Sequence, residues 1–207
     1  MIIVPIGIDC GVCEVLKKYN FRNFALPFDW VVTYKGITEI LKNNFDNYIP
    51  EIDNNTEFID GVPNVFNKYD VKFIHDKFQN KDQIDKYYRR IKRFNNILNN
   101  TDEEIIFLKK GHSHHHHEEY DFKDDITDVI ELDNYLQENY KNLKYKIIVG
   151  LLCNKCYNSI EFPENPRIVI LKNLITDIRD NTLHNKIISG HCYEQLFRSQ
   201  ILLKYLK

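Results

Sequence analysis

Residues 2–11 of the chain read IIVPIGIDCG, an apolar run that ends in an aspartate, a cysteine and a glycine. A short apolar run of this kind predicts a buried β-strand. The apolar spacing of residues 12–19 then predicts a helix that opens at Cys10. Strand, tight turn and helix in this order are typical of the first unit of an α/β fold.

Later runs repeat this apolar character without alternating polar residues, which indicates strands buried on both faces of a sheet. They are Glu104–Leu108, Tyr145–Leu152 and Arg167–Leu171. Helical spacing predicts helices at Lys35–Asn44, Lys81–Leu98, Asp133–Tyr140 and His191–Leu206. Residues 46–70 hold Pro50, Pro63, Gly61 and many Asn and Asp residues, which predicts loops. The pattern predicts a three-layer α/β fold: a mostly parallel, hydrolase-like sheet with helices on both faces.

The composition favours a single domain over residues 1–207. The chain has 207 residues, and 43% of them are hydrophobic, which suits one well-buried core. Lys and Arg total 28 against 30 for Asp and Glu, and a formal net charge of -2 provides no basic footprint for nucleic acid. We therefore expect no nucleic-acid partner.

The cellular setting is predicted from the first residues and the cysteines. The N-terminal residues lack the basic region and cleavage site of a secretory signal, and no apolar stretch reaches the roughly 18 residues of a membrane helix. The chain has five cysteines, an odd number that favours free thiols in a reducing compartment. We expect a soluble, cytoplasmic protein with no membrane partner.

Cysteines and histidines gather where the predicted strands end. Parallel strands with right-handed crossovers bring their carboxyl ends to one edge of the sheet, where α/β proteins bind their ligands. Cys10 follows the first strand, the tract His112–His117 follows the second, and Cys153 and Cys156 follow the third. A helix N-terminus favours the reactive thiolate and offers N–H groups to an oxyanion. Cys10 is therefore a candidate nucleophile, and the alternative is that it is a small buried apolar residue.

Four short segments resemble a known family. They are PIGIDC at residues 5–10, ALPFDW at 25–30, IHDKF at 74–78 and RIKRF at 90–94. Together they resemble a poorly characterised family from bacteria and large DNA viruses that is labelled as papain-like cysteine peptidases. The resemblance implies an enzyme that acts on peptides by acyl transfer, in the host cytoplasm if the protein is viral.

The same resemblance implies roles for three residues. Cys10 would be the nucleophile, His75 its histidine partner, and Asp29 a carboxylate that orients or supports the pair. Asp29 has an equally open structural interpretation, in which its carboxylate binds backbone groups in a turn beside buried Trp30. Both interpretations predict that Asp29→Ala harms the protein, but only the catalytic one predicts that this variant folds normally.

The order strand, Asp9, Cys10 and helix also resembles the first block of SGNH/GDSL-type hydrolases, with Cys in place of Ser. In those enzymes the base histidine lies just before the last helix, a position that His191 occupies here. The aspartate that normally stands three residues earlier is absent, because Ile188 is there. His75, His112 and His191 thus all remain candidate bases.

Two patterns suggest metal binding as an alternative. The histidines of residues 112–117 could bind zinc, copper or nickel, although consecutive histidines in one loop cannot all face one ion. Cys10 with Cys13 and Cys153 with Cys156 have the spacing of zinc or redox pairs. Neither pattern outweighs the nucleophile interpretation, so we expect no metal site and no cofactor.

Two function classes follow from the sequence. The first is a cysteine hydrolase in which Cys10 attacks the carbonyl of a peptide or ester. The second is a non-catalytic binding or structural protein that keeps a hydrolase-like fold. The prediction leaves the individual substrate and the oligomeric state open.

Overall fold

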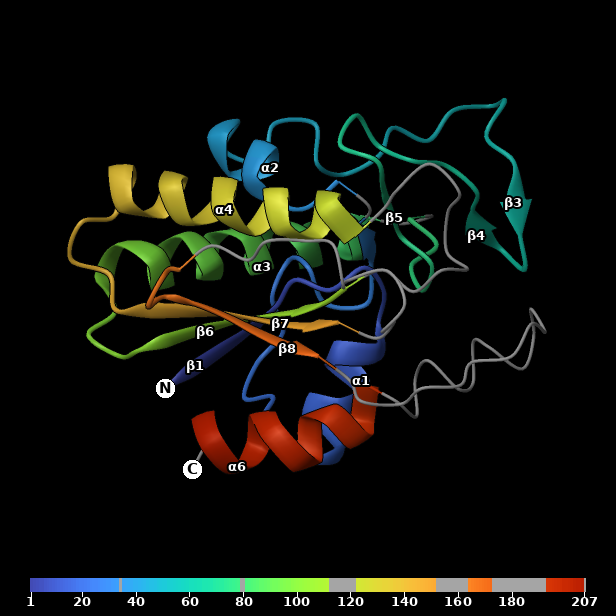
Figure 1. The fold of residues 1–207 in the computed structure, drawn as a ribbon. Helices are drawn as coiled ribbons and strands as arrows, with labels where there is room; N and C mark the ends of the chain where they lie inside the picture. Colours follow the sequence, from blue (N-terminus) through green and yellow to red (C-terminus); the bar gives the residue numbers. More distant parts are fainter. Residues whose placement is uncertain (34, 79–80, 112–121, 152–163, 173–192, 207) are drawn as a thin grey trace.

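The computed structural model describes residues 1–33, 35–78, 81–111, 122–151, 164–172 and 193–206 (Figure 1). Its centre is a four-stranded parallel sheet in the order β1-β6-β7-β8. The strands are β1 (Ile2–Pro5), β6 (Ile105–Lys110), β7 (Tyr145–Leu151) and β8 (Ile168–Lys172). This arrangement confirms the predicted parallel sheet and α/β fold.

Helices cover both faces of the sheet, as Figure 1 shows. On one face lie α2 (Thr38–Lys42), α3 (Lys81–Asn100) and α4 (Phe122–Asn139). On the other lie α1 (Gly11–Lys18) and helical residues 193–205, which include the π-helical turn η1 (Phe197–Ile201) and α6 (Leu202–Tyr205). The three layers follow from the strand sequences, because continuous apolar strands need cover on both sides.

The side chains of strand β6 alternate between the two cores, one on each face of the sheet. Successive side chains of a strand point to opposite faces. Ile105 and Phe107 belong to the core formed with α3 and α4, whereas Ile106 and Leu108 belong to the core formed with α1 and residues 193–206. The strand ends with Lys109 and Lys110, which are each 2% exposed and continue the same alternation.

Two small antiparallel sheets lie outside the four-stranded sheet. β2 (Val32–Thr33) pairs with β5 (Val71–Lys72), and β3 (Phe58–Ile59) pairs with β4 (Val62–Pro63). β3 and β4 form a hairpin whose turn residues, Asp60 and Gly61, have φ angles of 52° and 76°. An Asp-Gly pair favours such a turn because both residues tolerate positive φ. The predicted loop at 46–70 therefore contains a hairpin.

The largest difference from the prediction concerns α4. It begins at Phe122, eleven residues before the predicted start at Asp133. Its first half carries many acidic residues, yet Ile126, Val129 and Leu132 are buried at helical spacing. The helix is amphipathic, but its apolar stripe is narrow, so the charged positions around it made the helical pattern hard to recognise in the sequence. Among the described residues, no helix is long and apolar enough to cross a membrane.

Candidate active site

Cys10 lies in the turn between β1 and α1, at the carboxyl edge of the sheet. Backbone N–H groups of Ile6 and Ile8 donate to the carbonyl oxygens of Leu108 and Lys110 at 2.9 and 3.4 Å, so the chain stays beside β6 beyond the end of β1. Cys10 is the N-cap of α1, and its carbonyl oxygen accepts a bond from Glu14 N–H at 3.0 Å. The residue is partly exposed, as a nucleophile needs to be.

A partly buried ion pair holds this turn in place. Lys110 Nζ lies 2.6 Å from Asp9 Oδ2, with side chains that are 3% and 19% exposed. The other oxygen, Asp9 Oδ1, accepts a hydrogen bond from Gly11 N–H at 2.8 Å. Asp9 therefore connects the first turn of α1 with the end of β6. Because its bond takes the Gly11 N–H, that group is not available to an oxyanion.

Sequence reasoning did not single out Lys110 or its neighbour Lys109. Lys109 points to the other face, where its Nζ lies 3.3 Å from Asp125 and 3.2 Å from Asp128. Two lysines at the end of an apolar strand were the available signal. A buried lysine needs a carboxylate partner, so each lysine indicates an acidic residue nearby.

The pKa of Cys10 is raised to about 11. Burial is the largest cause, followed by the negative charges of Asp9 and Glu14, while the positive charge of Lys110 acts in the opposite direction. The Cys10 thiol also donates a hydrogen bond to Glu14 Oε1, with Sγ and Oε1 3.8 Å apart. The expected lowering of this pKa is wrong, because burial and the two carboxylates raise it more than Lys110 and a backbone hydrogen bond lower it.

We expect Glu14→Gln to lower the pKa of Cys10, because the change removes a negative charge and keeps the side chain's size. The iodoacetamide alkylation rate of Cys10 below pH 9 should rise, since the thiolate is the form that reacts. The measurement is a rate-against-pH profile by peptide mass spectrometry, with the exposed Glu51→Gln as matched control. Identical profiles for the two variants would show that Glu14 does not act on the thiol.

Asp29 sits in a buried polar cluster. It is 1% exposed, and its Oδ2 accepts a hydrogen bond from Arg22 Nε at 2.8 Å and lies 2.6 Å from Arg22 Nη2 in an ion pair. Burial raises the pKa of Asp29, while the Arg22 guanidinium opposes the rise. Cys13 lies beside this pair, and its pKa is raised to about 12 by burial and by Asp29. Cys13 is thus a buried structural thiol.

Arg90 is a further residue near Asp29 that sequence reasoning missed. Its positive charge lowers the pKa of Asp29, and its guanidinium carbon lies 5.0 Å from the ring centroid of Tyr87. Within the described part of the chain, Arg90 Nε and Nη1 and Asp29 Oδ1 are buried without a hydrogen-bond partner. Arg90 is one of several charged residues on the amphipathic α3, and the sequence pattern alone did not separate it from the exposed ones.

His75 is exposed and packs edge-on against Trp30, with ring centroids 5.6 Å apart. Asp76, which follows it, is buried and accepts bonds from Lys86 and Tyr87. Trp30 follows Asp29 directly, so the two family-like segments meet through this ring contact. The charged groups with the largest effects on the pKa of Cys10 are Asp9, Glu14 and Lys110.

The remaining predicted site residues lie outside the described residues. They are His191, the tract His112–His117, Cys153 and Cys156. The catalytic roles of Cys10, His75, Asp29 and His191 therefore stay predictions. In the described ranges, no group of three or more His, Cys, Asp or Glu side chains is placed to hold a metal ion.

Comparison with known protein families identifies one that matches this chain. Residues 1–153 match the family model DUF1796, described as "Putative papain-like cysteine peptidase". The chain belongs to this family. The matched residues include Cys10, Asp29, Trp30 and His75, as the motif resemblance predicted. No curated protein and no solved structure matches the chain.

Proposed function

We propose that this member of the DUF1796 family is a cysteine hydrolase that uses Cys10 as its nucleophile on peptide or ester carbonyls. The observation that carries the proposal is the position of Cys10. It is a partly exposed thiol at the strand-to-helix turn, at the edge of a parallel sheet where α/β proteins bind ligands. The family description supports the same class of reaction.

The reaction would proceed through a thioester. A base takes the Cys10 proton, and the sulfur attacks the carbonyl carbon while the carbonyl π electrons move to oxygen. The tetrahedral intermediate collapses, the carbon–nitrogen or carbon–oxygen bond breaks, and the leaving group takes the proton from the base. Water then attacks the thioester and releases the acid and the free thiol.

The raised pKa of Cys10 makes the base essential. A pKa of about 11 leaves about one thiol in a thousand ionised at pH 8. We assign the base to a histidine, His75 or His191, and a supporting role to Asp29, as the family resemblance implies. Backbone N–H groups of the first turn of α1 other than that of Gly11 would hold the oxyanion.

Cys10→Ala is expected to lower hydrolysis of coumarin-labelled peptides or nitrophenyl esters by a factor on the order of 10³ or more, because the covalent step is lost. Cys13→Ala is the matched control, since it removes a buried thiol from the same helix. Steady-state rates measured on folded protein test this. Equal residual activity in the two variants would contradict the proposal.

A second candidate function is a binding protein that keeps this fold without turnover. The specific observation in its favour is the raised pKa of the Cys10 thiol. This alternative predicts no turnover of any peptide or ester by the wild-type protein. It also predicts that Cys10→Ala leaves ligand binding unchanged.

A further inference from the structure

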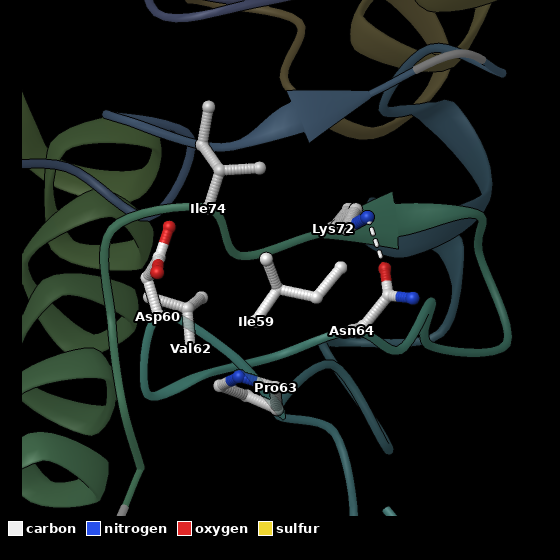
Figure 2. A pocket seen from close by; sticks show the side chains of 7 residues that line it. All are labelled: Ile59, Asp60, Val62, Pro63, Asn64, Lys72 and Ile74. Carbon is white, nitrogen blue, oxygen red and sulfur yellow. Dashed lines mark hydrogen bonds between the residues drawn. The ribbon is translucent and has the colours of Figure 1, made fainter. Parts of the chain in front are cut away.

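The β3–β4 hairpin with Asn64, and residues 72–74 at the end of β5 and after it, line an open pocket of about 250 Å³ (Figure 2). Its apolar walls come from both segments, and three polar residues complete the lining. The lining residues are Ile59, Asp60, Val62, Pro63, Asn64, Lys72 and Ile74. None of them belongs to the site built around Cys10.

Exposed apolar side chains gather around this pocket. Phe58, Ile59 and Phe66 are 40%, 53% and 46% exposed. They make up half of the six large hydrophobic side chains that are exposed in the described ranges, although they lie within nine consecutive residues. Clustered exposed apolar surface of this kind marks an interaction site more often than scattered residues do.

Two of the three polar side chains of the pocket, Lys72 and Asn64, form hydrogen bonds within the protein, and Asp60 is the exception. Lys72 Nζ donates to Asn64 Oδ1 and lies 5.4 Å from the ring centroid of Phe66, while Asn64 Nδ2 donates to Glu57 Oε2 at 2.9 Å. Asp60 has no hydrogen bond or ion pair to any described residue. Figure 2 shows Asp60 beside Ile74, on the opposite side of the pocket from the Lys72–Asn64 pair.

The pocket lies close to the Cys10 turn in the fold. Thr33 N–H donates to Ile8 oxygen at 3.1 Å, and Thr33 pairs with Val71, the residue before Lys72. Two strand spacings, roughly 10 Å, therefore separate the Ile8 backbone from β5. An extended peptide covers that distance in about three residues.

We propose that this pocket binds the side chain of a lysine in an extended peptide, with its methylene stem against Ile59, Val62 and Ile74 and its ammonium group at Asp60. An apolar wall with one carboxylate that no described residue pairs is complementary to an apolar stem that ends in a cation. As the subsite of a substrate, the pocket rests on the proposed peptidase function. Lys77 extends over the Gly61 turn without pairing with Asp60. The ammonium group of the ligand would therefore bind Asp60 with the Lys77 side chain nearby.

The test is binding without turnover. Fluorescent peptides of alanine with one central lysine, norleucine or glutamate are titrated into the Cys10→Ala protein and followed by anisotropy. Norleucine keeps the stem and removes the charge. The lysine peptide should bind about fivefold more tightly than the norleucine peptide, as expected for a partly exposed ion pair, and the glutamate peptide should bind most weakly.

Two variants assign the effect to the pocket. Asp60→Asn should remove the preference for lysine over norleucine, whereas Asp102→Asn, an exposed carboxylate outside the pocket, should keep it. Ile59→Ser should weaken both peptides. Equal affinities for lysine and norleucine, or a preference that survives Asp60→Asn, would overturn the proposal. If wild-type protein binds the lysine peptide through Asp60 yet never cleaves it, the peptidase function fails and the binding site stands.

Discussion

Arg22→Met is expected to destabilise the protein by about 3 kcal/mol at pH 8, because it removes the guanidinium that pairs directly with the buried Asp29 carboxylate. Asp29 is 1% exposed, and Arg22 supplies both a hydrogen bond from Nε and an ion pair through Nη2. A buried charge that has lost its partner costs far more than a surface charge does. Urea unfolding followed by circular dichroism measures the difference.

The loss in Arg22→Met should shrink as the pH falls from 8 to 5. Burial already raises the pKa of Asp29, and removing the guanidinium raises it further. The folded variant then holds a proton that the unfolded chain has released, so its stability falls as the pH rises. The exposed Arg89→Met is the control, with stability close to wild type at both pH values. A pH-independent loss, or none, would show that Arg22 does not neutralise Asp29.

This result also decides between the two interpretations of Asp29. If the carboxylate is needed to hold residues 22–29 against Cys13, then Asp29→Ala should lose stability as well as any activity. If its role is catalytic only, Asp29→Ala should unfold at the same urea concentration as wild type. The buried pair with Arg22 leads us to expect a loss of stability, whether or not Asp29 also acts in catalysis.

Lys110→Met is expected to raise the pKa of Cys10 above its value of about 11 and to slow alkylation of this thiol by about tenfold at pH 8. Lys110 is the cation that opposes Asp9 and Glu14 at the sulfur, and its own burial keeps its charge from being screened. The change also removes the ion pair between Lys110 and Asp9, which should loosen the first turn of α1.

The variant Lys110→Arg distinguishes the effect of the positive charge from an effect on folding. It keeps the cation and should restore most of the alkylation rate, whereas Lys110→Met should not. Lys146→Met, which removes an ammonium group from a surface pair with Glu104, is the control for loss of a lysine. Alkylation of Cys10 at the wild-type rate in folded Lys110→Met protein would contradict the role assigned to Lys110.

The fold could be predicted from the sequence where one local pattern determined it. The apolar run at residues 2–8 and the helical spacing after Cys10 gave β1 and α1, because continuous apolar strands and periodic helices need only local information. The end of β6 was not predicted. Lys109 and Lys110 are polar by sequence, and only distant carboxylates of Asp125, Asp128 and Asp9 make their burial possible.

The candidate site likewise has features that the sequence predicts and features that it does not. The position of Cys10 at the edge of the sheet followed from the strand-turn-helix pattern. The pKa of its thiol did not, because the helix N-terminus is a local effect, whereas burial and the balance between Glu14, Asp9 and Lys110 arise from the packing of β6 against the turn. The Asp60–Gly61 turn, by contrast, was a readable hairpin signal.

The most direct test of the account is to trap the acyl-enzyme. Wild-type protein is mixed with a nitrophenyl ester at pH 8, quenched in acid within the first turnover, and analysed by intact and peptide mass spectrometry. We predict one acyl group per protein on Cys10, retained in Cys13→Ala and absent in Cys10→Ala. Acylation spread over lysines and other thiols, with Cys10 unmodified, would contradict the assignment of Cys10 as the nucleophile.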